Sequence, residues 1–417
     1  MRRPAPADDA DDATRPGDAT RPGDAIQPGE RRLWTAEFTI AVLINALTMV
    51  VFYLLMTTMA LYAAERFAAS DALAGLASSM FIIGAVVARV VGGPLIGRSG
   101  PRRVLVWSLV VFIAMSLAYL VAVDLVLLLA VRLVHGIAFG LANTSVTTIA
   151  QAVIPRRRRG EGTGYFSLSV PLAGAVGPLA GLALIEAWGY EALFVGSLVA
   201  SGAAFVAALS LRGAPRDPRP APARPWWRAF LDRDALPLAG IMLATGVVNA
   251  SVITFVHPFT VTSGVGAFAG TFFGVNALGV LASRLFAGRV QDRLGDNWVM
   301  YPALLALGGG LVVLSQADSV PQLLVAAGVI GLGFGSVTPT VQAATVNLVQ
   351  PHNIGLAVAT FYLLLDLGTG LGPLLLGAVV SAWDYRVMYL ASAALVVVIA
   401  VHYTLVHGRH AGRARHR

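Results

Sequence analysis

The stretch VARVVGGPLIGRSGPRR, residues 87–103, places an arginine inside a run of apolar and small residues and then ends in a basic turn. The stretch ASRLFAGRVQDRLG, residues 282–295, has the same order of residue types. Arg89 corresponds to Arg284 and Gly93 to Gly288, and both pairs are 195 positions apart. Because a buried arginine recurs at one fixed offset, the chain is expected to hold two copies of one structural unit.

The overall composition is that of a membrane protein. Hydrophobic residues fill 57% of the 417 positions and charged residues only 12%, whereas soluble domains carry about 25% charged residues. Runs of roughly 20 apolar residues, long enough to cross a ~30 Å hydrocarbon core as a helix, recur along the chain. The sequence therefore predicts an all-α integral membrane protein with twelve transmembrane helices, at residues 37–63, 72–97, 104–123, 126–150, 163–185, 192–211, 236–262, 268–290, 298–316, 321–346, 356–380 and 387–406.

The arginines predict the orientation of these helices. With a cytoplasmic N-terminus, two arginines lie in outer loops, three lie within spans, and the other 25 of the 30 lie on the cytoplasmic side. This asymmetry is typical of loops that obey the positive-inside rule, so both termini are predicted to be cytoplasmic. The net charge of +8 therefore reflects membrane topology, and no nucleic-acid partner is expected.

Two segments rich in proline, glycine and charge divide the chain. Residues 1–35, with the hexapeptide ATRPGD written twice, predict a disordered cytoplasmic tail rather than a cleaved signal peptide. Residues 212–235 predict an extended cytoplasmic linker between six-helix bundles at 36–211 and 236–408, followed by a basic tail at 409–417. Further pairs at the 195-residue offset support two pseudo-symmetric bundles: Gly136 and Gly331, Phe139 and Phe334, Gly140 and Gly335, Gly160 and Gly355, Gly177 and Gly372, Pro178 and Pro373.

Over residues 36–408 the chain resembles the major facilitator superfamily, and within it the twelve-helix drug/proton antiporter branch. The family's loop motif G-x-L-x-D-R-x-G-x-R-[KR] is similar to residues 93–103, except that Gly97 stands in place of the aspartate; the second copy keeps the acid and the arginine as Asp292 and Arg293. The antiporter motif G-x8-G-x3-GP-x2-GG is matched in part, at Gly164, Gly177, Pro178 and Gly181, with Ala173 and Leu182 replacing glycines. These glycines, with Gly372 and Pro373, indicate close helix packing, which is either a trait of exporters or a general trait of transporters.

The resemblance implies two bundles that rock about a central site and a cytoplasmic gate that opens and closes. Asp292 is expected to dock on the positive end of the helix that follows PRRRRGEG, residues 155–162, with Arg158 or Arg159 as a partner. Since Gly97 has no carboxylate, the gate is expected to be asymmetric. Arg89 and Arg284 are either paired gate elements or residues that snorkel to lipid phosphate. The gate is predicted to consist of Arg89, Gly93, Arg98, Gly100, Arg102, Arg284, Gly288, Asp292 and Arg293.

Proton coupling is assigned to Asp366, Arg132 and His135. Asp366 is the one carboxylate expected near the middle of a span, about 15 Å deep at 1.5 Å per residue, and is either a proton carrier or half of a static salt bridge with Arg132 or Arg284. Arg132 and His135 share a helical stripe with Phe139, Asn143 and Thr147, which should face the central cavity. His135 is either a hydrogen-bonded packing residue or a carrier.

The family analogy places the substrate cavity at Asn45, Tyr53, Phe139, Asn143, Asn249, His257, Thr338 and Gln342. Such a lining suits a small amphiphilic organic compound. Proton-coupled efflux of a drug or metabolite across the cell membrane is the predicted function; uptake of a metabolite and a non-transporting receptor are the alternatives. The chain has no cysteine and no HExxH, nucleophile-elbow or Walker motif, so no enzyme, cofactor or metal site is expected. The expected partners are a small-molecule substrate, protons and the lipid bilayer, and the protein is expected to be a monomer.

Overall fold

The computed structural model describes residues 32–69, 71–211, 231–264 and 268–409, and within these ranges every regular element is helical. Residues Leu33–Arg417 form one compact unit. The predicted disordered tail, linker and basic tail lie mostly outside the described residues. At the described edge of the N-terminal tail, Leu33 is 1% exposed, and the Thr35 hydroxyl accepts a hydrogen bond from the Phe38 backbone N–H at 3.2 Å. The domain boundaries stay a prediction.

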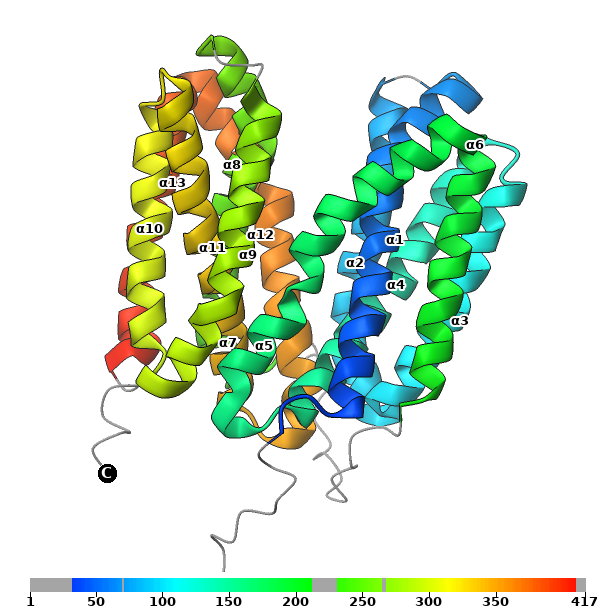
Figure 1. Cartoon of the computed structure of the whole chain (residues 1–417), viewed down its shortest axis with the longest axis horizontal. Coiled ribbons are helices and arrows are strands. Elements are labelled where there is room, and N and C mark those ends of the chain that lie inside the picture. The colour runs from blue at the N-terminus through cyan, green and yellow to red at the C-terminus, as the bar shows by residue number, and fades with distance from the viewer. Residues whose placement is uncertain (1–31, 70, 212–230, 265–267, 410–417) are drawn as a thin grey trace, which may run out of the picture. The chain divides into compact units, whose positions relative to one another are not determined.

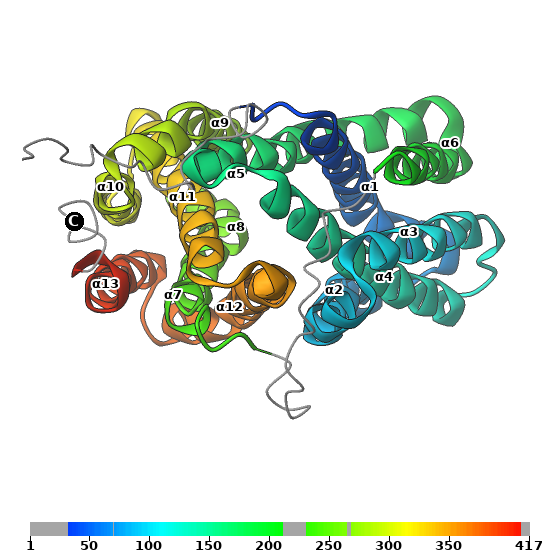
Figure 2. The ribbon, with the colours of Figure 1, turned by 90° about the horizontal axis from the view of Figure 1, so that it is seen from below.

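The N-terminal half consists of α1 to α6 (Figures 1 and 2). Its long helices pack in pairs, α1 against α6 and α2 against α4, with α3 against α4. The bounds are α1 (Ala36–Phe67), α2 (Asp71–Ser99), α3 (Pro101–Ala118), the 3-10 turn η2 (Tyr119–Val121), α4 (Leu125–Val153), the 3-10 turn η3 (Arg156–Arg158), α5 (Arg159–Ser167) and α6 (Ser169–Leu209).

The C-terminal half repeats this pairing. Here α8 packs against α12, α9 against α11 and α10 against α11. The same order of contacts in both halves is what an internal repeat predicts. The bounds are α7 (Leu236–Ala239), α8 (Ile241–Thr262), α9 (Ala269–Leu294), α10 (Asn297–Ser315), α11 (Val320–Leu348), η6 (Pro351–Asn353), α12 (Ile354–Ala382), α13 (Tyr385–Tyr403) and the π-helical turn η7 (Thr404–Gly408).

Among the described residues, 11 helical segments are long and apolar enough to cross a membrane. One of them, Arg156–Leu209, has 54 residues, or about 80 Å of helix at 1.5 Å per residue, far more than a ~30 Å hydrocarbon core. The segment turns at Gly189, whose φ of 79° and ψ of −176° are not helical. This turn lies between the spans expected at 163–185 and 192–211, while the count of twelve spans stays a prediction.

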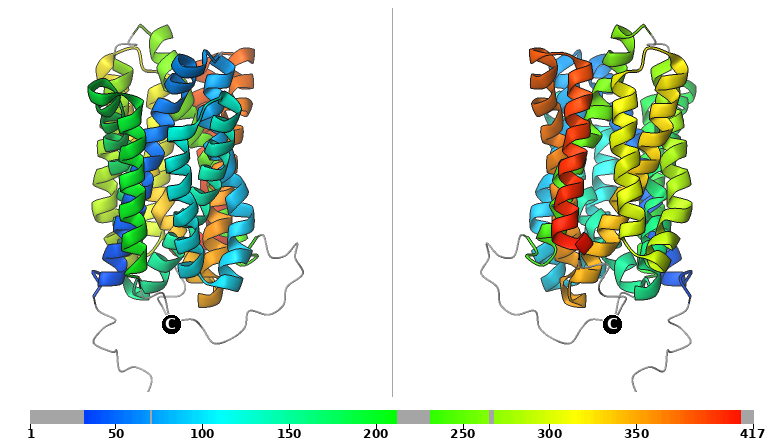
Figure 3. Two further views of the ribbon diagram at one scale, coloured as in Figure 1. Left: turned by 90° about the vertical axis from the view of Figure 1, so that its right-hand side faces the viewer. Right: turned by 90° about the vertical axis from the view of Figure 1, so that its left-hand side faces the viewer.

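The start of α1 and the end of α13 lie at the same end of the unit Leu33–Arg417 (Figure 3). We call this the gate end, because the two motif turns also lie there. Gly100 precedes α3 with a φ of 81°, and Gly295 follows α9 with a φ of 99°. Both values lie in the left-handed region that favours glycine. Each half therefore makes the same tight turn, at positions 195 residues apart.

Candidate functional site

The two halves meet closely where α5 crosses α9. A Cβ added at Gly288 would lie 2.3 Å from the Gly160 carbonyl oxygen, and one added at Gly160 would lie 2.7 Å from the Gly288 carbonyl oxygen. Backbones can approach this closely only where neither residue has a side chain. The glycine of the repeated motif is thus a crossing point between the halves.

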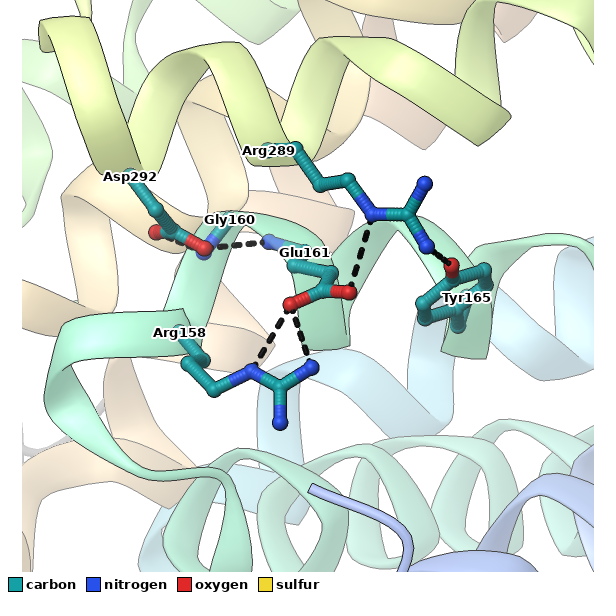
Figure 4. Close-up of polar contacts among 6 residues, drawn as sticks. All are labelled: Arg158, Gly160, Glu161, Tyr165, Arg289 and Asp292. Carbon is teal, nitrogen blue, oxygen red and sulfur yellow. Dashed lines mark hydrogen bonds and ion pairs between the residues drawn. The ribbon is translucent and has the colours of Figure 1, made fainter. Parts of the chain in front are cut away.

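Asp292 of α9 holds the start of α5 at this crossing (Figure 4). The Gly160 N–H donates to its Oδ1 at 2.7 Å, and the Glu161 N–H donates to its Oδ2 at 2.8 Å. A carboxylate that accepts N–H groups from the first turn of a helix is stabilised by the positive helix end. This is the docking geometry that the sequence predicts for Asp292.

The arginines near Asp292 have other hydrogen-bond partners than the sequence suggests. Arg158 pairs with Glu161 at 2.7 Å. Arg159 donates to the Asn347 side-chain oxygen on α11 at 3.0 Å. The hydrogen bonds to Asp292 come from backbone N–H groups of the helix end, while Arg159, one of the two predicted partners, lies close enough to add its positive charge.

A second layer of side chains supports the crossing (Figure 4). Glu161 accepts from Arg289 of α9 at 3.1 Å, and Arg289 also donates to the Tyr165 hydroxyl. The Trp34 ring lies 5.4 Å from the Tyr165 ring. The sequence analysis missed these residues, although Arg289 directly follows the motif glycine. Together they form the α5–α9 clasp, defined as Gly160, Glu161, Tyr165, Gly288, Arg289 and Asp292.

At the gate end, the related contact between α2 and α12 is also close, but it has no acid at the position that corresponds to Asp292. A Cβ at Gly93 would lie 2.6 Å from Leu356 Cδ1, and one at Gly355 would lie 2.7 Å from Ile96 Cγ2. Gly97, which occupies the position of Asp292 in the first copy, is exposed, and a Cβ there would meet nothing within 4 Å. The geometry of the two contacts is therefore asymmetric, and the effect on transport stays a prediction.

The other predicted gate arginines lie near the gate end. Arg102 donates to the Leu211 carbonyl at 2.5 Å and to the Leu209 carbonyl at 3.2 Å. These bonds tie the start of α3 to the end of α6 within the N-terminal half, so they do not join the halves. Arg98 and Arg293 are both exposed.

An ion pair between buried Arg89 and partly buried Asp366 joins the halves deeper in the unit. Arg89 Nε of α2 lies 2.5 Å from Asp366 Oδ2 of α12, and the Arg89 side chain is 5% exposed. Arg89 Nη1 also donates to Asn143 and Thr144 of α4, both at 3.3 Å. Its guanidinium lies 4.4 Å from the centre of the Tyr362 ring. All the polar groups around Arg89 are thus protein groups of the interior, which is not the arrangement of a snorkelling residue.

The expected partners of Asp366 are corrected by this pair. The sequence analysis gave Arg132 or Arg284 and took Arg89 as a gate element, whereas the structure pairs Asp366 with Arg89. Tyr362 was not predicted, although it lies one helical turn before Asp366 on α12. That spacing was a usable signal, since residues four apart share a helix face.

A chain of hydrogen bonds leads from the ion pair into the N-terminal half. Asn143 Nδ2 donates to Asn45 Oδ1 at 3.1 Å, and Asn45 Nδ2 donates to Ser169 Oγ at 2.5 Å. Ser169 in turn donates to the Phe166 carbonyl of α5 at 2.7 Å. These hydrogen bonds thus connect Asp366 with α5, whose other end is held in the α5–α9 clasp. We call this series of residues the polar chain: Asp366, Arg89, Asn143, Asn45 and Ser169.

Arg132 and His135 lie elsewhere than the sequence predicts. Arg132 is 1% exposed and donates to the Ala77 and Ser78 carbonyls at 2.8 and 3.1 Å. His135 Nδ1 lies 3.0 Å from the Tyr119 hydroxyl, and the residue is fully buried. Both are enclosed by helices of the N-terminal half, so the expectation that this part of the stripe faces a central cavity is wrong. His135 has the environment of a hydrogen-bonded packing residue.

The remaining predicted cavity residues are dispersed. Phe139 stacks on Phe52 at 5.2 Å, and Gln342 donates to the Tyr362 hydroxyl at 3.4 Å. Asn249 lines a small cavity in the C-terminal half with Asn276 and Phe334. Three further residues have unrelated surroundings: Thr338 donates to the carbonyl of Phe334 on its own helix, His257 is exposed, and the Tyr53 ring faces Gly174.

The glycines of the antiporter-like motif lie where helices approach closely. A Cβ at Gly177 would lie 2.7 Å from Tyr53 Cβ, and one at Gly181 would lie 3.2 Å from the Leu54 carbonyl oxygen of α1. In the second half a Cβ at Gly372 would lie 2.4 Å from Ala250 Cβ of α8. Pro178 and Pro373 lie inside α6 and α12. Close packing is thus present, and a link to export stays a prediction.

Two like sets of helices, joined through motif glycines and an ion pair between the halves, define a multi-pass transporter of the cell membrane. The sequence profile of the Major Facilitator Superfamily matches residues 41–314 and 238–416. The chain belongs to this family of transporters.

Known relatives agree with this placement. The staphylopine export protein of Staphylococcus aureus (strain Mu50 / ATCC 700699) is 24% identical over 352 residues, which cover 80% of this chain and 87% of that protein. Multidrug resistance protein MdtG of Klebsiella pneumoniae (strain 342) is 24% identical over 395 residues, covering 91% and 96%. The crystal structure of the human organic anion transporter MFSD10 is similar in fold, with a TM-score of 0.78, 17% identity and coverage of 90% and 100%.

Proposed function

We propose that the protein is a proton-coupled exporter of a small amphiphilic organic compound and that it works by alternating access. The observation that carries the coupling is the Arg89–Asp366 pair, because it is an ionisable contact between the two halves. The names of the staphylopine export protein and of MdtG support the direction of transport. The fold supplies two halves that move against each other.

The proposed coupling step is the protonation of Asp366. A proton on this carboxylate removes its charge, and with it the attraction that holds α12 to α2 through Arg89. The freed Arg89 keeps its hydrogen bonds to Asn143 and Thr144 of α4. The positive charge therefore stays with the N-terminal half when the halves separate.

The proposed gate is the α5–α9 clasp. Its closed form is held by the hydrogen bonds from Gly160 and Glu161 to Asp292, and by the pair of Glu161 with Arg289. The polar chain links the ion pair with α5, so a change at Asp366 has a direct route to the clasp. In this proposal the clasp opens to admit substrate and closes before its release on the other side.

The proposal is tested in everted membrane vesicles that carry a respiration-generated pH gradient. A panel of drugs and organic metabolites is added to vesicles with the wild-type protein and to vesicles without it. Release of protons together with uptake of one compound into the vesicles, in the wild type alone, is the expected result. Movement of every transported compound out of the vesicles would contradict efflux and support uptake into the cell.

A further inference from the structure

Arg284 of α9 is a buried cation whose charge is not balanced. It is 6% exposed, and its Nε and Nη1 atoms are buried without a hydrogen-bond partner among the described residues. Its counterpart in the first half, Arg89, has the Asp366 carboxylate and two further acceptors. Burial of a charged guanidinium with two nitrogens that lack acceptors lowers the free energy of unfolding of the protein. The buried charge of Arg284 therefore lowers the stability of the fold, and packing alone does not explain why it is present.

The sequence repeat shows why Arg284 lacks an acid. The residue 195 positions before Asp366 is Pro171, so the second contact between the halves has no carboxylate at the related position. The Arg89–Asp366 pair has no net charge, and Arg284 thus adds one positive charge to the region between the halves. The Tyr362 ring, which lies 4.4 Å from the Arg89 guanidinium, is also a neighbour of Arg284. One negative charge brought by a ligand would make this group of residues neutral.

The position of Arg284 gives a ligand a route to it. A Cβ at Gly164 of α5 would lie 3.2 Å from the Arg284 carbonyl oxygen, so this part of α9 faces the opposite half. Asp292 of the clasp is two helical turns further along α9, about 12 Å at 1.5 Å per residue. Separation of α5 from α9 would therefore uncover Arg284 from the gate end. A compound that enters through the opened clasp would therefore meet the Arg284 guanidinium.

We propose that Arg284 binds the carboxylate of the transported compound, and that the substrates are amphiphilic organic monoanions. This inference rests on the proposed transport function. A guanidinium donates charge-assisted hydrogen bonds to a carboxylate, and the Nε and Nη1 atoms of Arg284 each have no acceptor among the described residues, so either atom can bind the anion. Closing the clasp over a bound anion then pairs the buried charge, whereas closing it empty leaves the charge unpaired. Arg284 thus makes the loaded protein close more readily than the empty one.

The test measures binding by isothermal titration calorimetry with the full-length protein purified in detergent. The probes are benzoate, octanoate and 4-phenylbutyrate, each compared with its neutral amide. The variants are Arg284→Gln, which removes the charge, Arg284→Lys, which keeps it, and Arg386→Gln as the matched control. Arg386 is suited to this role because it is an exposed arginine that pairs with Asp318. Thermal unfolding of each variant checks that it is folded.

At least one carboxylate is expected to bind the wild type and the Arg386→Gln variant about tenfold or more tightly than it binds the Arg284→Gln variant. The matching amide is expected to bind weakly and with no dependence on Arg284. Equal binding of acid and amide, unchanged acid binding by Arg284→Gln, or no binding of any carboxylate to the wild type would overturn the proposal. Binding as expected, without proton release in vesicles, would instead leave Arg284 in its role and refute proton-coupled efflux.

Discussion

Arg89 on α2 and Asp366 on α12 form an ion pair between the two halves of the chain, and the residue 195 positions before Asp366, which would be the related acid, is Pro171. At the gate end the asymmetry is reversed. There Asp292 docks on α5, whereas Gly97, at the related position of α2, has no carboxylate. The α2–α12 contact thus has its acid deep in the unit, at Asp366, whereas the α5–α9 clasp has Asp292 and Glu161 at the gate end.

Removal of the Asp292 charge is expected to open the clasp. Asp292→Asn loses the charge that faces the end of α5, a loss of about 1–2 kcal/mol that favours the open form roughly tenfold. The measurement is the rate of maleimide labelling of a cysteine introduced by Ile96→Cys, because Ile96 is 3% exposed and packs on Gly355. The natural chain has no cysteine to interfere.

Asp296→Asn is the matched control for this measurement. Asp296 lies at the same end and accepts hydrogen bonds from Gln291 and His407, both within the C-terminal half. Its replacement should leave the labelling rate unchanged. Similar acceleration by the two variants would show that Asp292 has no special part in holding the halves together.

Addition of an acid at Gly97 is expected to create a second clasp. The position is open, so Gly97→Asp can place a carboxylate near the start of α12, where Gly355 already packs on Ile96. The extra charge should stabilise the closed form by about 0.3–1 kcal/mol and slow exchange of substrate by up to roughly fivefold. Gly97→Asn, which has the same shape and no charge, should transport at the wild-type rate in vesicles. If both variants slowed substrate exchange equally, the cause would be the volume of the new side chain rather than its charge.

A methyl group at Gly288 is expected to keep the clasp from closing. The added Cβ would lie 2.3 Å from the Gly160 carbonyl oxygen, and relief of such a clash costs about 1–3 kcal/mol. Gly288→Ala should therefore accelerate labelling of the cysteine introduced by Ile96→Cys. Gly274→Ala, on the same helix but with nothing within 4 Å, should have no effect. A wild-type labelling rate for Gly288→Ala would mean that the crossing is not part of the gate.

Replacement of the two buried arginines by methionine is expected to change stability in opposite directions. Arg284→Met removes an unpaired charge and should raise the free energy of unfolding by about 1–4 kcal/mol. Arg89→Met leaves Asp366 without its partner and should lower this free energy by about 3–5 kcal/mol. Urea-induced unfolding of the purified proteins in detergent micelles measures both. Destabilisation by Arg284→Met would show that this guanidinium is paired after all.

The sequence predicted the fold in detail because apolar runs and a fixed repeat offset are properties of the chain itself. It also predicted that Asp292 docks on a helix end, since the motif places an acid near a glycine crossing. It failed for the partner of Asp366 and for the placement of Arg132 and His135 beside a central cavity, whereas a hydrogen-bonded packing residue was one of its two alternatives for His135. Those outcomes depend on which helix faces are in contact, and hydrophobic periodicity is weak when a helix is apolar all round.

Arg132 shows most clearly why the sequence does not predict the partner of a buried charge. A charged residue within a span favours a polar partner, but backbone carbonyls such as those of Ala77 and Ser78 serve as well as a carboxylate. Residue types alone do not distinguish these cases. The 195-residue offset was the better guide, because Pro171 and Gly97 mark the positions where the two halves differ.

The central claim is that Asp366 carries the transported proton. The most direct test measures two quantities in the same proteoliposomes: substrate-dependent proton release, and exchange of labelled for unlabelled substrate without a pH gradient. Asp366→Asn should abolish proton release and retain exchange, while Asp318→Asn, at an exposed ion pair, should retain both. Proton release by the Asp366→Asn variant at the wild-type rate would contradict the account.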